Sequence, residues 1–536
     1  MRYLLHDLFL DSVKNFPNNE AIYLENRGAI TYSALNLLAN KFSNTFLKIK
    51  QDRRQNPYIG ILSTVHINSI ASVLGAIKIG CAYVPLDEHS PTERLKHILL
   101  NTHMNCLAID PIFYEKYKEL LNLESLKKII FLDNFTFNNT CEKFITFENI
   151  LQESSDEPEL INQVCDDLVY VLHSSGSTGV PKGIMMTHRN ARTFVDWMQK
   201  EFKLTNNDVV MSRSPFKFDL SVFDIFNTFK AGAKLVCYDW NFKRDESEKH
   251  ESYVNLIESQ KATVLYATPS TFISLMNRGN LKNKKLYLRT IMYAGEPFPV
   301  PQLRILKEIL PNTKIANIYG PTETNIITYY WIDNIPEDLT SIPLGQEVDD
   351  TEIIIVSDDS KRICQPLECG ELWCRGGTVT LGYLGMQEKT DECLVQSPFH
   401  SYPAKFWRTG DYGYRDQAGI LYYKGRRDHI IKVKGFRIEL GEIECALAQF
   451  KDIDEFCVVA VPDEKYGNRL YCFYSSIENK IINQEELIKF LQEKIPSYMI
   501  PFKFFQQNVL PKTSSGKIDR IMLTESIKSK VTSDVA

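Results

Sequence analysis

The sequence predicts a large N-terminal α/β domain followed by a small C-terminal α+β domain. The chain has 536 residues, which is enough for two or more domains with substantial cores. Residues 1–165 alternate helical and strand-like patterns, as is typical of layered α/β folds. After about residue 428, short strands and short helices alternate over roughly a hundred residues, a pattern typical of a small α+β domain.

Composition excludes several classes of protein. Apolar residues make up 44% and charged residues 24% of the chain, which is ordinary for a soluble globular protein. The formal net charge of −5 argues against a nucleic-acid-binding surface. The amino terminus lacks the features of a secretory signal. The longest apolar segment, residues 59–86, is interrupted by His66, Asn68 and Lys78, so it predicts a core helix and strand and not a membrane span. We therefore expect a cytoplasmic protein.

The cysteines do not form a metal-binding pattern. The chain contains 12 of them without any C-x-x-C pair, and no histidine accompanies the evenly spaced Cys364, Cys369 and Cys374. A zinc site is therefore not expected. In the absence of a secretion signal, we expect all of these cysteines to be reduced thiols.

A loop rich in glycine and hydroxyl groups follows a predicted buried strand at residues 169–172. Its residues are Ser174, Ser175, Gly176, Ser177, Thr178 and Gly179, with Lys182 shortly after them. Glycine lets backbone N–H groups approach an anion, hydroxyl groups donate further hydrogen bonds, and lysine adds positive charge. The loop therefore suits a polyphosphate, although its spacing differs from the G-x-x-x-x-G-K-[ST] loop. A helix is predicted to begin at about Asn190.

The string SSGSTGVPKG resembles the phosphate-binding loop of adenylate-forming enzymes, in particular the amino-acid adenylation domains of nonribosomal peptide synthesis. The usual loop begins Tyr-Thr-Ser-Gly, whereas this chain has His173 and Ser174 at the first two positions. Further motifs follow in the family's order over about residues 10–525. The resemblance implies the adenylate-forming fold, with a multi-subdomain N-terminal core over residues 1–427 and a mobile C-terminal domain over residues 428–536. It also implies ATP as substrate and Mg²⁺ as cofactor.

The segment ANIYGPTETNII resembles the family's NxYGPTE motif. The resemblance implies a nucleotide site that includes Asn317, Tyr319, Gly320 and Thr322. Tyr319 offers a flat ring for stacking on adenine, and the Thr322 hydroxyl can hydrogen-bond the α-phosphate. The carboxylate of Glu323 is a hard oxygen ligand suited to Mg²⁺ that bridges phosphates.

Later motifs complete the implied nucleotide site. Asp411, in the string TGD, can accept hydrogen bonds from both ribose hydroxyls, and Arg426 matches a residue that reaches the ribose. Asp428 matches the hinge, and Gly435 matches a backbone position that lines the path of the acceptor thiol. Lys517, after a Ser/Gly loop, matches the family's catalytic lysine. The segment GELWCRGGTVTLGYL is expected to be structural.

Asp219 is the main indication of an amino-acid substrate. It lies in the apolar segment PFKFDLSVFDIF, where a buried carboxylate is costly unless it meets a cation. In the family, an aspartate at this place binds the substrate's α-amino group. The other pocket positions implied by the resemblance are Leu220, Phe223, Tyr266, Met292, Ala294, Ile318, Ile326 and Ile327, with Lys517 closing the set. This lining is apolar apart from one tyrosine, Asp219 and Lys517.

A compact apolar amino acid fits such a lining, and the set resembles that of stand-alone prolyl–carrier-protein ligases. L-Proline is therefore the expected substrate, with D-alanine, valine and other small amino acids as alternatives. No carrier-domain motif follows Arg520, so we expect the acceptor to be a phosphopantetheine arm on a separate carrier protein, or free coenzyme A. An acyl- or aryl-coenzyme A ligase of the same fold is a second alternative, and a non-enzymatic binding protein a third.

Overall fold

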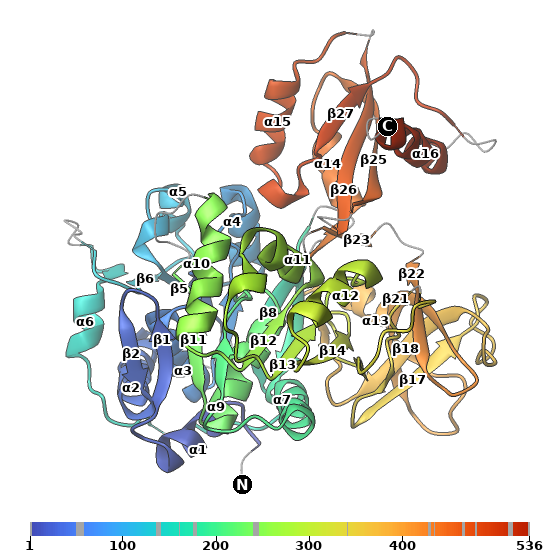
Figure 1. The fold of residues 1–536 in the computed structure, drawn as a ribbon. Helices are drawn as coiled ribbons and strands as arrows, with labels where there is room; N and C mark the ends of the chain where they lie inside the picture. The colour runs from blue at the N-terminus through green and yellow to red at the C-terminus, as the bar shows by residue number, and fades with distance from the viewer. Residues whose placement is uncertain are drawn as a thin grey trace.

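The chain folds into a broad two-sheet body, a β-rich lobe beside it and a small C-terminal unit that projects from both (Figure 1). The fold is taken from a computed structural model. It describes residues 3–49, 58–135, 141–159, 161–174, 180–239, 246–339, 341–426, 430–433, 435–463, 467–477, 480–512 and 518–533. Within these ranges, no helix combines the length and the apolar character that a membrane span requires.

The first large sheet has a parallel centre and antiparallel edges. In spatial order its strands are β16 (Gln346–Glu347), β15 (Thr328–Trp331), β14 (Lys314–Tyr319), β13 (Thr290–Tyr293), β12 (Val264–Ala267), β10 (Val209–Met211), β11 (Lys234–Cys237), β1 (Glu20–Leu24) and β2 (Gly28–Thr31). The carboxyl ends of β12, β13 and β14 meet at one edge, where ligands bind in open parallel sheets.

The second large sheet carries the phosphate loop. Its strand order is β19 (Gly382–Tyr383), β9 (Lys182–Thr187), β8 (Leu168–Ser174), β4 (Ala82–Pro85), β3 (Tyr58–Leu62), β5 (Cys106–Ile109), β6 (Lys128–Phe131) and β7 (Phe144–Ile145). Strands β8 and β9 are antiparallel neighbours, and the predicted phosphate-binding residues 175–179 between them lie outside the described residues. Strand β9 was not predicted, because its start at Lys182 falls within the glycine-rich segment.

Helices cover and separate these sheets. They are α1 (Asp7–Asn15), α2 (Tyr32–Ile49), α3 (Ile67–Lys78), α4 (Thr92–Asn101), α5 (Lys118–Leu121), α6 (Phe147–Gln152), α7 (His188–Phe202), α8 (Leu220–Val222), α9 (Thr228–Ala231), α10 (Glu246–Ser259), α11 (Pro269–Arg278) and α12 (Val300–Ile309). Residues 69–78 of α3 are all buried, and its side chains join both sheets in one apolar core. Residues 59–86 thus form the predicted core helix and strand.

Helix α7 begins two residues before the predicted start at Asn190. Thr187 is the N-cap, and its hydroxyl accepts a hydrogen bond from the Asn190 N–H while the Asn190 side chain bonds back to Thr187. Asn190 is therefore the third helical residue of a reciprocal cap and not the cap itself.

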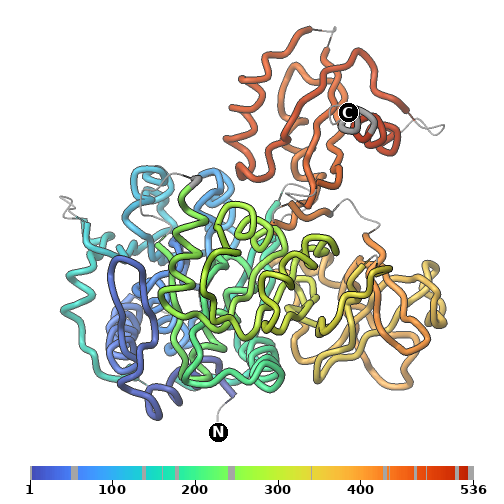
Figure 2. The backbone as a smooth tube through the Cα atoms, in the orientation of Figure 1, coloured from blue at the N-terminus to red at the C-terminus, as the bar shows by residue number. Residues whose placement is uncertain are grey.

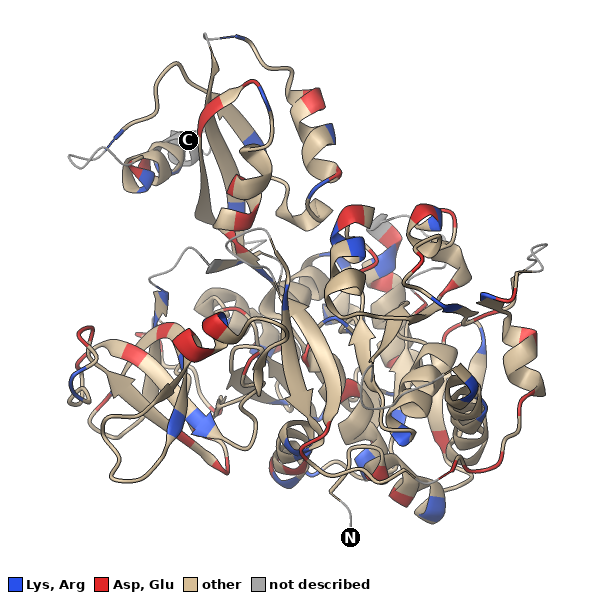
Figure 3. Ribbon diagram, turned by 180° about the vertical axis from the view of Figure 1, so that it is seen from behind, with Lys and Arg blue, Asp and Glu red and all other residues tan. Residues whose placement is uncertain are grey.

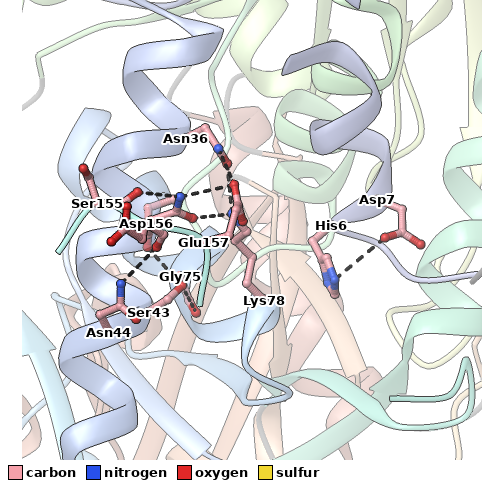
Figure 4. Close-up of polar contacts among 12 residues, drawn as sticks. His6, Asp7, Asn36, Ser43, Asn44, Gly75, Lys78, Ser155, Asp156 and Glu157 are labelled. Carbon is pink, nitrogen blue, oxygen red and sulfur yellow. Dashed lines mark hydrogen bonds and ion pairs between the residues drawn. The ribbon is translucent and has the colours of Figure 1, made fainter. Parts of the chain in front are cut away.

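A set of polar contacts, called the strap below, holds the loop at residues 153–159 against α2 (Figure 4). Asn36, Asn40 and Asn44 lie at four-residue intervals on one face of α2 and donate to oxygen atoms of this loop. The buried ammonium group of Lys78 donates to Asn36 at 2.9 Å and to Glu157 at 2.8 Å. The strap fixes the chain shortly before it enters β8.

The β-rich lobe contains β17 (Thr351–Val356), β18 (Gly370–Gly376), β20 (Leu394–Gln396), β21 (Lys405–Arg415) and β22 (Leu421–Arg426), with α13 (Gln387–Cys393). The chain then crosses to the C-terminal unit through the hairpin of β23 (Ile430–Val433) and β24 (Phe436–Glu439) (Figure 2). The proposed domain boundary at 427/428 lies outside the described residues and stays a prediction.

The C-terminal unit has its own apolar core. It comprises β25 (Ile453–Asp463), β26 (Gly467–Ser476) and β27 (Lys503–Gln506), with α14 (Leu440–Leu447), α15 (Gln484–Gln492) and α16 (Arg520–Ser533). Acidic and basic side chains are interspersed along the outer helices of the molecule (Figure 3).

Candidate active site

The arms of the phosphate loop are in place at the carboxyl end of β8. Ser174 on β8 pairs in register with Lys182 on β9, and the predicted loop residues 175–179 lie outside the described residues. The Oγ atom of Ser174 and the Nδ1 atom of His173 are buried without a hydrogen-bond partner in the described part of the chain. Buried polar atoms are normally satisfied, so this pair fits a ligand rich in oxygen atoms, such as a phosphate. Burial, with Arg94 and His97 nearby, lowers the pKa of His173 to about 3, so its ring is neutral.

Glu323 follows the carboxyl end of β14 and is 1% exposed. The Tyr383 hydroxyl donates to Oε1 at 2.8 Å, and Nη1 of Arg437 donates to Oε2 at 2.7 Å. Burial would raise the pKa of Glu323, but Arg437, Lys182 and Tyr383 outweigh it and lower the pKa to about 2. Glu323 is therefore ionised at neutral pH. Mg²⁺ typically binds one or two carboxylates together with substrate phosphates, so this residue fits the ion once Arg437 moves away.

Lys182 also has a partner from the hairpin that leads into the C-terminal unit. Its Nζ atom lies 2.5 Å from Oε1 of Glu439 and 5.5 Å from the centre of the Tyr383 ring. Arg437 and Glu439 are two residues apart on β24, so their side chains leave the strand on the same side. One strand thus neutralises both the predicted phosphate-binding cation and the predicted metal-binding carboxylate.

The predicted ribose-binding residues come together. The Tyr319 hydroxyl donates to Oδ2 of Asp411 at 2.6 Å, and Nη1 of Arg426 lies 3.0 Å from Oδ1. Asn317 is also nearby on β14, but its amide donates to the Pro343 carbonyl at 2.7 Å. That contact uses one of the two N–H donors of the Asn317 side chain.

Gly320, which follows Tyr319, lies where the backbone comes close to the backbone of Asn325. A Cβ atom at Gly320 would lie 2.2 Å from the carbonyl oxygen of Asn325. Glycine at this position is therefore required by packing, whatever its role towards a nucleotide.

The predicted amino-acid pocket forms one cluster in the apolar core. Its buried members are Phe223, Tyr266, Met292, Ala294, Ile318, Ile326 and Ile327, and Leu220 packs against them. Tyr266 on β12 is in register with Met292 on β13, and Met292 with Ala316 on β14. Because residues two apart on a strand share a face, Ala294 and Ile318 lie at the next level of the same surface.

The segment that carries Asp219 has an unusual helical geometry. After α8, residues Phe223–Asn227 form a π-helix, and the Phe223 ring meets the Tyr266 ring edge to face at 5.4 Å. Short π-helical turns are rare and frequently occur at functional sites.

Asp219 lies at the polar end of this pocket. Burial raises the pKa of Asp219 to about 6, although the cation of Lys432 and a hydrogen bond from Thr322 both lower it. Lys432 comes from β23, and burial lowers its own pKa. A raised pKa means that the Asp219 charge is incompletely compensated, which is the environment that a substrate ammonium group would relieve.

Two further predicted residues lie outside the described part of the chain, in addition to residues 175–179. They are Lys517, the predicted catalytic lysine, and Asp428, the predicted hinge. Gly435 is described, at the turn between β23 and β24, with a φ of +84°.

Sequence reasoning missed five polar residues at the site, namely Glu296, Tyr383, Lys432, Arg437 and Glu439. Tyr383 belongs to the segment that was expected to be structural, yet its hydroxyl donates to Glu323. The alternation of polar Arg437 and Glu439 with apolar Phe436 and Ile438 was a readable signal, because it predicts a strand with two charges on one face.

Comparison with known proteins agrees with this geometry. The pattern of the AMP-binding enzyme family matches residues 9–384, and that of the AMP-binding enzyme C-terminal domain matches residues 442–517. The L-proline–[L-prolyl-carrier protein] ligase of Pseudomonas fluorescens is 30% identical over 98% of this chain and 99% of its own length. Bacitracin synthase 1 of Bacillus licheniformis is also 30% identical over 98% of this chain, which spans only 9% of that protein.

A solved structure shares the fold. The Vibrio cholerae adenylation domain AlmE, in complex with glycyl-adenosine-5′-phosphate, aligns with a TM-score of 0.84 at 21% identity, over 99% of this chain and 98% of its own. The predicted adenylate-forming fold is therefore confirmed. The chain belongs to the AMP-binding enzyme family, as an adenylation enzyme related to those of nonribosomal peptide synthesis.

Proposed function

We propose that the protein activates an amino acid, with L-proline the preferred substrate, as an aminoacyl-adenylate and passes it to the phosphopantetheine thiol of a separate carrier protein. The observation that carries this proposal is the buried carboxylate of Asp219 at the end of a set of apolar lining residues. A buried carboxylate is retained at such a place when a cation completes it. Acyl and aryl acids lack an ammonium group and have no need of it.

The pocket lining supports a small apolar side chain. The Phe223 and Tyr266 rings and the side chains of Met292 and Ile318 are buried and offer no charge to a substrate side chain. The prolyl-carrier-protein ligase relative, which matches this chain along almost its whole length, supports L-proline and a separate carrier protein. One methylene changes binding by only about 1–3 kcal/mol, so D-alanine and valine are the competitors to test.

In the first step, a carboxylate oxygen of the amino acid attacks the α-phosphorus of ATP, and the bond to pyrophosphate breaks. Two anions must meet, so positioning and charge neutralisation supply most of the catalysis. Lys182 and the Ser174 hydroxyl face the phosphates, Asp411 and Arg426 hold the ribose, and Asp219 holds the ammonium group. When bound at Glu323, Mg²⁺ would supply further positive charge at the phosphates. Lys517 is proposed to add a cation at the reacting carboxylate.

In the second step, the thiol sulfur attacks the acyl carbon and the acyl–phosphate oxygen bond breaks, releasing AMP. The thiol proton passes to solvent. We propose that residues 428–536 rotate about Asp428 between the two steps. The present pairs of Arg437 with Glu323 and of Glu439 with Lys182 belong to an arrangement in which both nucleotide-binding charges are occupied by protein.

Amino-acid-dependent ATP–pyrophosphate exchange tests the first step. The panel includes the proteinogenic amino acids, D-alanine, and several aryl and fatty acids. Strong exchange with L-proline is expected, and Asp219→Ala should abolish it. Asp224→Asn is the matched control, because Asp224 is buried in the same segment and accepts hydrogen bonds from the Arg213 and Ser214 N–H groups. Burial raises the pKa of Asp224 to about 8, so the neutral amide is a close replacement.

Other outcomes separate the alternatives. Exchange with D-alanine alone would replace the substrate and keep the mechanism. Exchange only with acids that lack an amine, unaffected by Asp219→Ala, would make the protein an acyl- or aryl-coenzyme A ligase. No exchange with any acid would refute adenylation by this chain.

A further inference from the structure

Glu296 joins three segments beside the amino-acid pocket. It lies just beyond the end of β13 and is only 9% exposed. Its Oε2 atom accepts a hydrogen bond of 3.2 Å from the Ser270 N–H in the first turn of α11, and its Oε1 atom accepts one from the Gly435 N–H. One carboxylate therefore caps a helix of the N-terminal part and holds the turn between β23 and β24.

The Gly435 turn is tightly seated against the start of α11. A Cβ atom at Gly435 would lie 2.7 Å from Cγ2 of Thr268, and the φ of +84° is in the region that only glycine adopts readily. Gly467, at the start of β26, approaches the same carboxylate, since a Cβ atom there would lie 3.2 Å from Oε1 of Glu296. Two glycine backbones thus approach Glu296, and at Gly435 a Cβ atom would require Thr268 to shift.

This junction adjoins the pocket on two strands. Ala294 lies two residues before Glu296, and Tyr266 lies two residues before Thr268. Lys432, three residues before Gly435, acts electrostatically on both Asp219 and Glu296. A displacement of the Gly435 turn would therefore also move Lys432 relative to Asp219, next to the place proposed for the acyl group.

We propose that Glu296 is a positioning residue for thiol transfer: by holding the Gly435 N–H, it keeps the turn in the place that lets a thiol reach the acyl carbon. The inference rests on the proposed thiol transfer and on the resemblance of Gly435 to the family position that lines the thiol's path. It assigns no contact between Glu296 and the amino acid or ATP, so the adenylation step should not depend on this carboxylate.

Two nucleophiles separate the two steps. Hydroxylamine is small and traps the adenylate as a hydroxamate, whereas pantetheine must reach the acyl carbon along the path of the natural thiol. For Glu296→Gln, which keeps the size but can no longer accept both N–H groups, hydroxamate formation with L-proline should stay within about twofold of the wild type. The kcat/KM for pantetheine should fall by about tenfold or more, the effect of losing roughly 1.4 kcal/mol.

Glu442→Gln is the matched control. Glu442 is a buried acid of the same hairpin-linked unit that pairs with Arg94 across the two parts of the chain. If Glu442→Gln lowers pantetheine transfer as much as Glu296→Gln does, Glu296 stabilises only the overall arrangement and the proposal is overturned. A loss of hydroxamate formation in Glu296→Gln, matching the loss of transfer, would also overturn it. If the wild type forms no hydroxamate with any amino acid, the proposed function itself fails, and this inference fails with it.

Discussion

The predicted amino-acid pocket and the predicted nucleotide site depend to different degrees on the hairpin of β23 and β24. The apolar lining of the pocket comes from residues 220–327, with Tyr266 and Met292 in register on neighbouring strands, and Asp219 is faced by Thr322 and by one hairpin cation, Lys432. In the nucleotide site, Lys182 and Glu323 are instead paired with Glu439 and Arg437 of β24.

The difference has a direct consequence for ligand binding. The apolar face of the pocket does not depend on the hairpin, because its side chains are packed in the core of the two-sheet body. In the rotation proposed above, the charge balance of the nucleotide site would change with the position of β24, because Arg437 now donates to the carboxylate that is predicted to bind Mg²⁺. MgATP and the present position of β24 should therefore compete.

The largest expected effect is at Glu323. Glu323→Gln keeps an oxygen and a similar shape but removes the negative charge, so pyrophosphate exchange should fall by about 100-fold or more. Tyr383→Phe is the matched variant, because it removes a hydrogen bond to Glu323 and leaves the charge. It should lower exchange by less than about tenfold. Equal losses in the two variants would contradict a metal-binding role for the carboxylate.

The pH dependence of amino-acid use should report Asp219. Its pKa is raised to about 6, so the charge that binds an ammonium group is present above that value and is lost as the pH falls through it. The kcat/KM for the amino acid should drop about tenfold between pH 7 and pH 5. A profile that is flat over this range would place the titrating group elsewhere.

The same carboxylate should make the folded protein less stable at neutral pH. The pKa of Asp219 is about 6 in the folded protein and about 3.9 in the unfolded chain. At pH values above 6 the carboxylate is charged in both states, and its ionisation lowers the free energy of unfolding. Stability from this group rises as the pH falls through 6 towards 4. Asp219→Asn should therefore raise the thermal unfolding midpoint at pH 7 while abolishing exchange, and a lowered midpoint would show that the charge is already compensated.

A smaller effect is expected from the pairs that β24 makes. Arg437→Ala leaves Glu323 without its cation and weakens the present position of β24, so the KM for MgATP should fall by about three- to tenfold. Thioester formation should slow at the same time, because that position is proposed to serve the second step. An increased KM for MgATP would mean that Arg437 assists nucleotide binding. Lys389→Ala, on the exposed α13, is the control for a lost surface cation.

The smallest effect should come from an ion pair outside both regions. Glu157→Gln removes the negative charge that pairs with the buried ammonium group of Lys78. The Glu157 side chain is 60% exposed, so water already screens this ion pair. Thermal unfolding should shift by the equivalent of about 1 kcal/mol or less, with exchange kinetics unchanged. A clear loss of exchange would connect the strap to the phosphate loop, which follows it in the chain.

The sequence by itself determined the fold class and the family, and it predicted a set of pocket residues that the structure places in one apolar core. Each depends on local order: the phosphate-loop string, NIYGPTE and the alternation of helices and strands are short-range patterns. The pocket also follows, because Tyr266, Met292 and Ile318 lie on successive parallel strands whose carboxyl ends must meet. The sequence did not predict strand β9, and it placed the start of α7 two residues too late. Glycine-rich segments and helix-capping residues give weak signals for where an element begins.

Only the tertiary structure decided which charges meet. Arg437 lies 114 residues from Glu323, Gly435 lies 139 residues from Glu296, and Glu439 lies 257 residues from Lys182. No spacing in the chain encodes such pairs, because they depend on where the hairpin after residue 426 is placed relative to the two large sheets. The sequence therefore names the groups that can bind ATP and an amino acid, while the placement of one hairpin decides which of them are occupied by protein.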